Sequence, residues 1–62
     1  MSYFNYHAKA KRLIAEGKLL YYEVVESYHN ISPALLLYFE DNLIMPIREH
    51  RFEEYFNLLD KL

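Results

Sequence analysis

The residues best suited to chemistry lie close together in the stretch "PIREHRFEEY", residues 46–55. Arg48, His50 and Arg51 supply two fixed positive charges and an imidazole, and Tyr55 supplies a phenol four residues after Arg51. If a helix begins near Arg48, these cations lie beside the free backbone N–H groups of its first turn, where an anion is favoured. Stacking of the Arg51 guanidinium on the Tyr55 ring would hold it in place. This spacing predicts an anion site.

Two simpler structural interpretations compete with the anion site. Glu49, Glu53 and Glu54 are numerous enough to neutralise the arginines, whose stems would then only cover apolar surface. Alternatively, the helix begins at Phe52 and leaves the arginines in the preceding loop.

The same residue types also suggest a catalytic interpretation. His50, Arg48, Arg51 and Tyr55 are similar in kind to the base, cations and phenol of ribonucleases that need no metal. The acidic pI of about 5.8 argues against RNA cleavage. The serines lie in no nucleophile motif, and Glu23 and Glu26 lie on opposite faces of their predicted strand, so they do not form a catalytic pair. We therefore expect no enzymatic activity.

The length of the chain limits it to one small domain, residues 1–62, and it has no cysteine to form a disulfide bond. Cysteine is absent, and no two histidines are spaced i, i+4, so we expect neither a metal ion nor another cofactor. Hydrophobic residues make up 53% of the chain. So small a domain cannot bury all of that area, so we expect exposed apolar surface for a partner protein or a second copy.

Charge is unevenly distributed along the chain. Residues 1–18 hold four basic and one acidic residue, whereas residues 19–47 hold four acidic and no basic residue. The net charge of −2 is not that of a general polyanion binder. No apolar run is long enough to span a membrane and the N-terminus lacks signal-peptide order, so we expect a cytoplasmic protein that does not bind membranes.

Helical periodicity predicts a first helix over residues 2–16. Ser2 can cap its start and Gly17 can end it in a left-handed conformation. One face collects the apolar positions, and the opposite face collects the polar ones; these are Tyr3, Tyr6, His7, Ala10, Leu13 and Ile14 against Lys9, Arg12 and Glu16.

The middle of the chain has the composition of β-strands. "LLYYEVVESY" alternates loosely, with Leu20, Tyr22, Val24 and Tyr28 on one face. "ALLLYF" follows as a central strand and "LIMPI" as an edge strand, since Pro46 cannot donate to a ladder; a turn at Asp41-Asn42 joins the two. Over residues 33–40 a helix capped by Ser32 is the alternative, because "SPALLLYF" also suits a helix start.

A second helix follows from an apolar stripe at helical spacing, made of Phe52, Tyr55, Phe56, Leu59 and Leu62. The predicted order is therefore α-β-β-β-α. We expect an α+β fold in which two helices pack on one face of a three-stranded antiparallel sheet, because that arrangement buries both stripes.

This order of elements resembles the double-stranded-RNA-binding domain over the whole chain. That resemblance implies RNA contacts from the first helix and from a basic cluster at the start of the last one, for which Lys9, Lys11, Arg12, Arg48 and Arg51 would serve. The family's cluster is rich in lysine, whereas "REHRFEEY" is mixed in sign. The string "ISPALLLYF…MPIREHRFEEY" also resembles small uncharacterised bacterial proteins, which implies no activity.

The sequence favours a small interaction or regulatory module that docks a protein or forms a homodimer through a tyrosine-rich sheet face or an edge strand. RNA binding is the alternative function.

Overall fold

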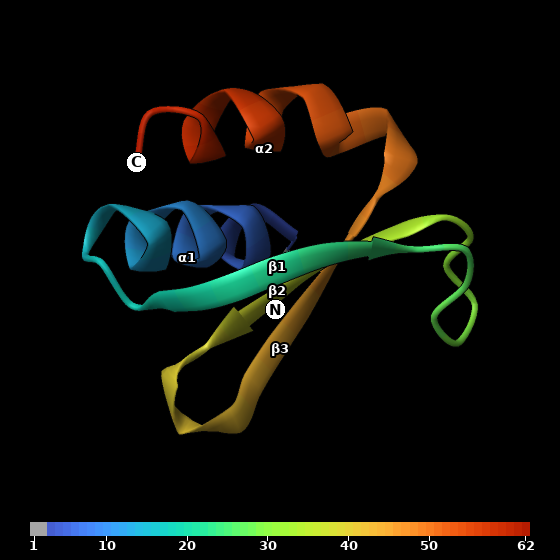
Figure 1. Ribbon diagram of the computed structural model, residues 1–62, viewed down its shortest axis with the longest axis horizontal. Coiled ribbons are helices and arrows are strands. Elements are labelled where there is room, and N and C mark those ends of the chain that lie inside the picture. Colours follow the sequence, from blue (N-terminus) through green and yellow to red (C-terminus); the bar gives the residue numbers. More distant parts are fainter. Residues whose placement is uncertain (1–2) are drawn as a thin grey trace.

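Two helices cover one face of a three-stranded antiparallel sheet (Figure 1), as the sequence predicts. The structure is a computed structural model that describes residues 3–62, so the predicted Ser2 cap lies outside the described residues. The elements are α1 (Tyr3–Ala15), β1 (Leu19–Val25), β2 (Ala34–Phe39), the 3-10 turn η1 (Glu40–Asn42), β3 (Leu43–Arg48), the 3-10 turn η2 (Glu49–Arg51) and α2 (Phe52–Leu59).

The sheet has the order β1-β2-β3, so β2 is central and both neighbours are edge strands. Its apolar run "ALLLYF" forms a strand, and the alternative helix over these residues is wrong. The Ser32 hydroxyl donates to the carbonyl of Glu26, 2.8 Å away, and does not cap a helix. Pro46 lies in β3 at the sheet's edge, where a missing N–H is tolerated, as expected.

The core lies between the sheet and the helices. Leu35, Leu37 and Phe39 of β2 alternate towards it, and both helices supply buried side chains. Its members are Ala10, Ile14, Leu35, Leu37, Phe39, Met45, Ile47, Tyr55 and Leu59. Burying each large apolar side chain contributes about 1.5–3 kcal/mol, so these few residues supply most of the drive to fold.

Three short turns depend on left-handed backbone. Gly17 ends α1 with φ of 77°, as predicted, and Asp41 and Asn42 have φ of 66° and 63° in the predicted turn before β3. His29 has φ of 55° between Tyr28 and Ile31, which form an isolated bridge. β1 ends at Val25, and the chain reverses direction between Tyr28 and Ile31. The prediction that the strand continues to Tyr28 is therefore wrong.

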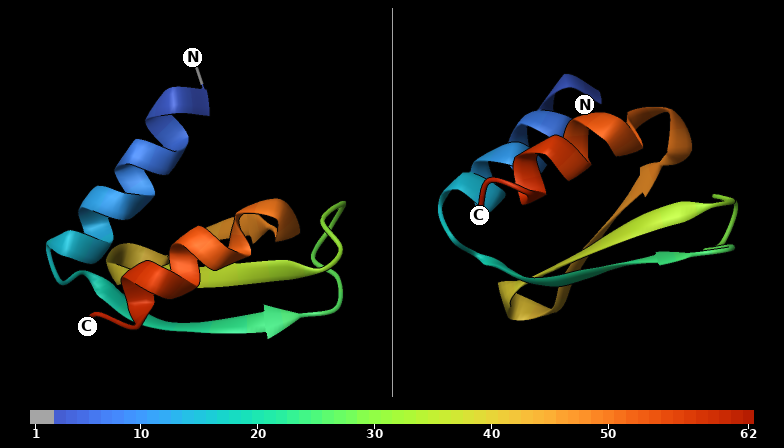
Figure 2. Two further views of the ribbon diagram at one scale, coloured as in Figure 1. Left: turned by 90° about the horizontal axis from the view of Figure 1, so that it is seen from above. Right: turned by 45° about the horizontal axis from the view of Figure 1, so that its top comes forward.

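The helices leave β1 largely uncovered. In Figure 2, β1 runs along the margin of the layer that α1 and α2 form over the rest of the sheet. Tyr22 and Val24 lie opposite Leu37 and Leu35, hence on the helix side, yet both are exposed. The other face of the sheet carries Tyr21 and no covering element among residues 3–62.

Candidate functional site

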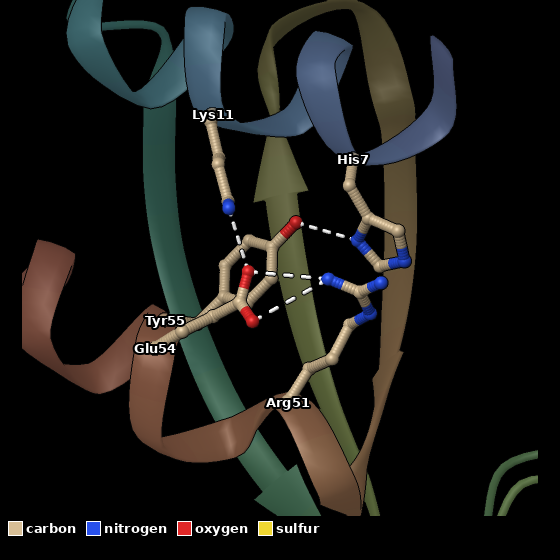
Figure 3. Close-up of polar contacts among 5 residues, drawn as sticks. All are labelled: His7, Lys11, Arg51, Glu54 and Tyr55. Atoms are coloured by element: carbon tan, nitrogen blue, oxygen red, sulfur yellow. Dashed lines mark hydrogen bonds and ion pairs between the residues drawn. The ribbon is translucent and has the colours of Figure 1, made fainter. Parts of the chain in front are cut away.

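A polar cluster joins the two helices above the core (Figure 3). His7 and Lys11, one turn apart on α1, project towards the second helix, where η2 supplies Arg51 and α2 supplies Glu54 and Tyr55. The i, i+4 spacing puts His7 and Lys11 on one face of their helix. The two helices are therefore linked by polar contacts as well as by the apolar core.

Tyr55 is the buried member of this cluster. Its side chain is 0% exposed, and its hydroxyl lies 2.8 Å from Nδ1 of His7. Burial, with a smaller contribution from the Glu54 charge, raises the pKa of Tyr55 to about 12. The phenol is thus protonated at neutral pH and donates to His7 when the imidazole is neutral.

His7 is kept neutral by its surroundings. Its pKa is lowered from 6.5, first by burial and then by Arg51, with further contributions from Lys11 and His50 that the Glu54 charge opposes. Arg51 and His7 also line one pocket. Positive charge therefore gathers around this imidazole.

Glu54 is the acidic centre of the cluster. Its Oε2 lies 2.6 Å from Nζ of Lys11 and 3.3 Å from Nη1 of Arg51. The hydrogen bond from Lys11, together with the charges of Lys11 and Arg51, lowers the pKa of Glu54 although burial opposes the shift. Two of the cations that the sequence assigns to ligand binding are thus paired with one internal carboxylate.

Two details of the predicted anion site are wrong. α2 begins at Phe52 and η2 precedes it, so the predicted cations of this stretch lie before the α-helix and not in its first turn. Arg51 pairs with Glu54, while Nζ of Lys11 lies over the Tyr55 ring, 5.7 Å from its centroid. Arg51 is drawn away from the ring because an acid one turn later attracts it more strongly.

A pocket of about 510 Å³ nevertheless brings three of the predicted residues together. Arg48, His50 and Arg51 line it from the end of β3 and from η2. The rest of the wall comes from Tyr6, His7, Ile31 and Pro46. Its lining holds no acidic side chain.

The three groups that the catalytic interpretation needs do not meet in this pocket. Tyr55 is absent from the lining of this pocket and is fully buried, so His50, Arg51 and Tyr55 do not converge on a common substrate position. The phenol contacts His7, which comes from the other end of the chain.

The two remaining predicted cations lie elsewhere. Arg12 pairs with Glu16, their Nε and Oε2 atoms being 3.9 Å apart. Lys9 lines a separate pocket of about 230 Å³ that also includes Glu40 and Asp41. The five cations of the predicted RNA surface are thus distributed over two pockets and three internal ion pairs, and Arg51 takes part in both a pocket and an ion pair.

A second candidate surface is apolar and belongs to β1. Leu20, Tyr21, Tyr22 and Val24 are 62%, 56%, 45% and 53% exposed. Among residues 5–62 only two other large apolar side chains, Ile44 and Leu62, are exposed. Tyr21 stacks on Tyr38 with ring centroids 4.3 Å apart, and the Tyr38 hydroxyl donates to Glu23, 2.7 Å away.

Sequence reasoning missed two parts of these sites. Glu54 appeared only as a neutralising charge, although its i, i+3 spacing from Arg51 was a usable signal. His7 belongs to the apolar face predicted for the first helix, but its partner Tyr55 lies 48 residues away in the chain, so no local spacing indicates the contact.

The part of the chain described by the structure holds no group of three or more acidic, histidine or cysteine side chains placed to bind a metal. Within residues 3–62, the helices are too short or too polar to cross a membrane. The chain matches no known protein-family model, and comparison with curated proteins and with solved structures gave no significant match. The resemblance to the double-stranded-RNA-binding domain stays a prediction.

Proposed function

We propose that this protein is a small interaction module that assembles with a second copy of itself through the free edge of β1. The observation that carries this proposal is the concentration of exposed apolar side chains on that strand: Leu20, Tyr21, Tyr22 and Val24. Pairing of two β1 edges would join two three-stranded sheets into one sheet of six strands.

The two edges of the sheet differ in a way that favours β1. β3 carries Pro46 and Arg48, and both residue types are used to discourage strand addition. β1 is seven residues long and contains neither proline nor a basic residue; its one charge is Glu23. An edge strand presents unpaired N–H and C=O groups, so β1 is the more open template.

A second copy complements β1 when the two strands run antiparallel about Tyr22. Each Tyr21 then faces Glu23 of the other copy, and Leu20, which lies at the irregularity in the β1–β2 register, comes near Val24. The apolar pair buries area, and the phenol can donate to the carboxylate as Tyr38 already does within one chain. Centring the strands on Glu23 would place two carboxylates face to face, which is unfavourable.

RNA binding, the alternative function, receives weaker support from the positions of its five predicted cations. Lys11 is engaged by Glu54, 2.6 Å away, and Lys9 lines a different pocket from Arg48 and Arg51, so the five predicted cations are not gathered in one pocket. The proposed dimer needs no catalytic group, cofactor or membrane. The absence of cysteine suits the reducing cytoplasm, where we expect it to act.

Sedimentation equilibrium of the wild type and of Val24→Lys tests the proposal. Val24 is largely exposed, so the substitution leaves the fold intact while placing a charge in the interface. We expect wild-type dimer between about 10 µM and 1 mM and monomeric Val24→Lys. Asn57→Lys, the same charge change on an exposed position of α2, should remain dimeric. A monomeric wild type at 1 mM would refute the proposal.

A further inference from the structure

The pocket beside η2 has the charge of an anion site. It lies where α1, Ile31 of the loop before β2, the end of β3 and η2 meet. Its titratable and charged lining consists of Arg48, Arg51, His50, His7 and the phenol of Tyr6, with no carboxylate among them. Arg48 makes no ion pair with any residue in the range 3–62, so its guanidinium is available to a ligand.

Arg51 is only loosely held by its internal partner. Its Nη1 lies 3.3 and 3.4 Å from the two oxygens of Glu54, whereas Lys11 Nζ lies 2.6 Å from the same carboxylate. Charge-assisted hydrogen bonds are normally about 2.7–2.9 Å long, so Lys11 satisfies Glu54 and the Arg51 contact is weak. Arg51 can therefore turn its remaining N–H donors towards a ligand at small cost.

The rest of the pocket lining is mainly apolar, and a hydrogen bond fixes part of it. The Tyr6 hydroxyl donates to the carbonyl of Pro46, 2.7 Å away, and so anchors the Tyr6 ring against β3. Ile31 and Pro46 extend this apolar surface. A pocket of about 510 Å³ lies within the range that small-molecule sites occupy, and it combines an apolar surface with a few convergent polar groups.

We propose that this pocket binds a small organic phosphate monoester, with the phosphoryl group between Arg48 and Arg51 and the organic part against Tyr6, Ile31 and Pro46. Two guanidinium groups suit the several acceptor oxygens and the nearly double negative charge of a phosphate. His50 also lines the pocket and can supply a third donor. The site includes no residue of β1, so it is independent of the proposed dimer.

The surroundings of His7 give the proposal a second readout. Arg51 and His50 of η2, Lys11 and Tyr6 of α1, and Glu54 and Tyr55 of α2 face this imidazole. Arg51, Lys11 and His50 disfavour its protonated form, and the charge of Glu54 opposes them. A bound phosphate would add negative charge, so His7 should take up a proton at a higher pH in the complex.

An amide NMR titration with phenyl phosphate tests the site, with inorganic phosphate and a short RNA duplex as parallel probes. We expect phenyl phosphate to shift the amides of residues 6–7 and 48–51, and to raise the pKa of His7 as read from its ring C–H signals. Inorganic phosphate should shift residues 48–51 with lower affinity, because it lacks the organic part. Arg48→Gln should weaken phenyl phosphate binding about tenfold or more.

Arg12→Gln is the matched control, because it removes the same charge from an exposed helix position outside the pocket. It should leave the affinity for phenyl phosphate unchanged. Equal losses in the two variants, or no shifts at about 10 mM phenyl phosphate, would overturn the proposal. RNA binding with shifts that spread over Lys9 and Arg12 and exceed the effect of phenyl phosphate would also overturn it, in favour of a nucleic-acid surface.

Discussion

The hydroxyl of Tyr55 and Nδ1 of His7 lie 2.8 Å apart, and this contact ties the buried face of α2 to α1. The two residues are 48 positions apart and lie near opposite ends of the chain. Around them, Lys11 and Arg51 share the carboxylate of Glu54 (Figure 3). The helices are thus held in one relative position by a polar contact at the edge of the core.

Tyr55→Phe should destabilise the protein by about 1 kcal/mol, because it removes one part-buried hydrogen bond and leaves Nδ1 of His7 without its donor. In a domain of this size, such a loss lowers the melting temperature by about 4–8 °C. Thermal unfolding followed by circular dichroism measures it. Asn57→Gln is the control, since that side chain is exposed on the same helix and lies outside the cluster, so this variant should unfold at the wild-type temperature. Equal melting of all three proteins would show that the His7 contact contributes nothing.

The cluster should also make stability fall in acid. The folded-state pKa of Glu54 is below its ordinary 4.5, so its contribution is present above that pH and is lost as the pH falls below it. The pKa of His7 is likewise below its ordinary 6.5, so the unfolded chain takes up a proton first and stability falls as the pH drops through that value. Both groups act in the same direction.

Urea midpoints measured from pH 7.5 to pH 3.5 test this pH dependence. Glu54→Gln should be less stable than the wild type at neutral pH, and the gap should close towards pH 3.5. Glu53→Gln on the same helix is the control, because Glu53 is exposed and makes no ion pair with residues 3–62. Parallel curves for the wild type and Glu54→Gln would contradict the assigned role of Glu54.

The local patterns of the sequence predict most of the fold. Gly17 and the Asp41-Asn42 turn have the positive φ values that their residue types favour, and the strand over 34–39 follows from an apolar run between turns. The stripe on the last helix is largely confirmed, with Tyr55 and Leu59 buried. The prediction that Leu62 belongs to this stripe is wrong, because α2 ends at Leu59 and the Leu62 side chain is 72% exposed.

The sites were harder to predict because they depend on how distant segments pack. Spacing alone suggested that Arg51 stacks on Tyr55, but whether an arginine turns to a ring or to Glu54 depends on the whole local charge distribution. The alternation of β1 suggested a half-buried strand. Its exposure follows from the position of the helices over the rest of the sheet, which no local pattern contains.

Disulfide formation by Tyr22→Cys tests the proposed β1 pairing most directly. The chain has no native cysteine, so any disulfide joins two copies at that position. Residues directly opposite each other in antiparallel strands have Cα atoms about 4.5–5.5 Å apart, within the range that a disulfide spans. Under mild oxidation, Tyr22→Cys should form a covalent dimer much faster than Asn57→Cys, an exposed position on α2. Equal rates in the two variants would contradict a dimer centred on Tyr22.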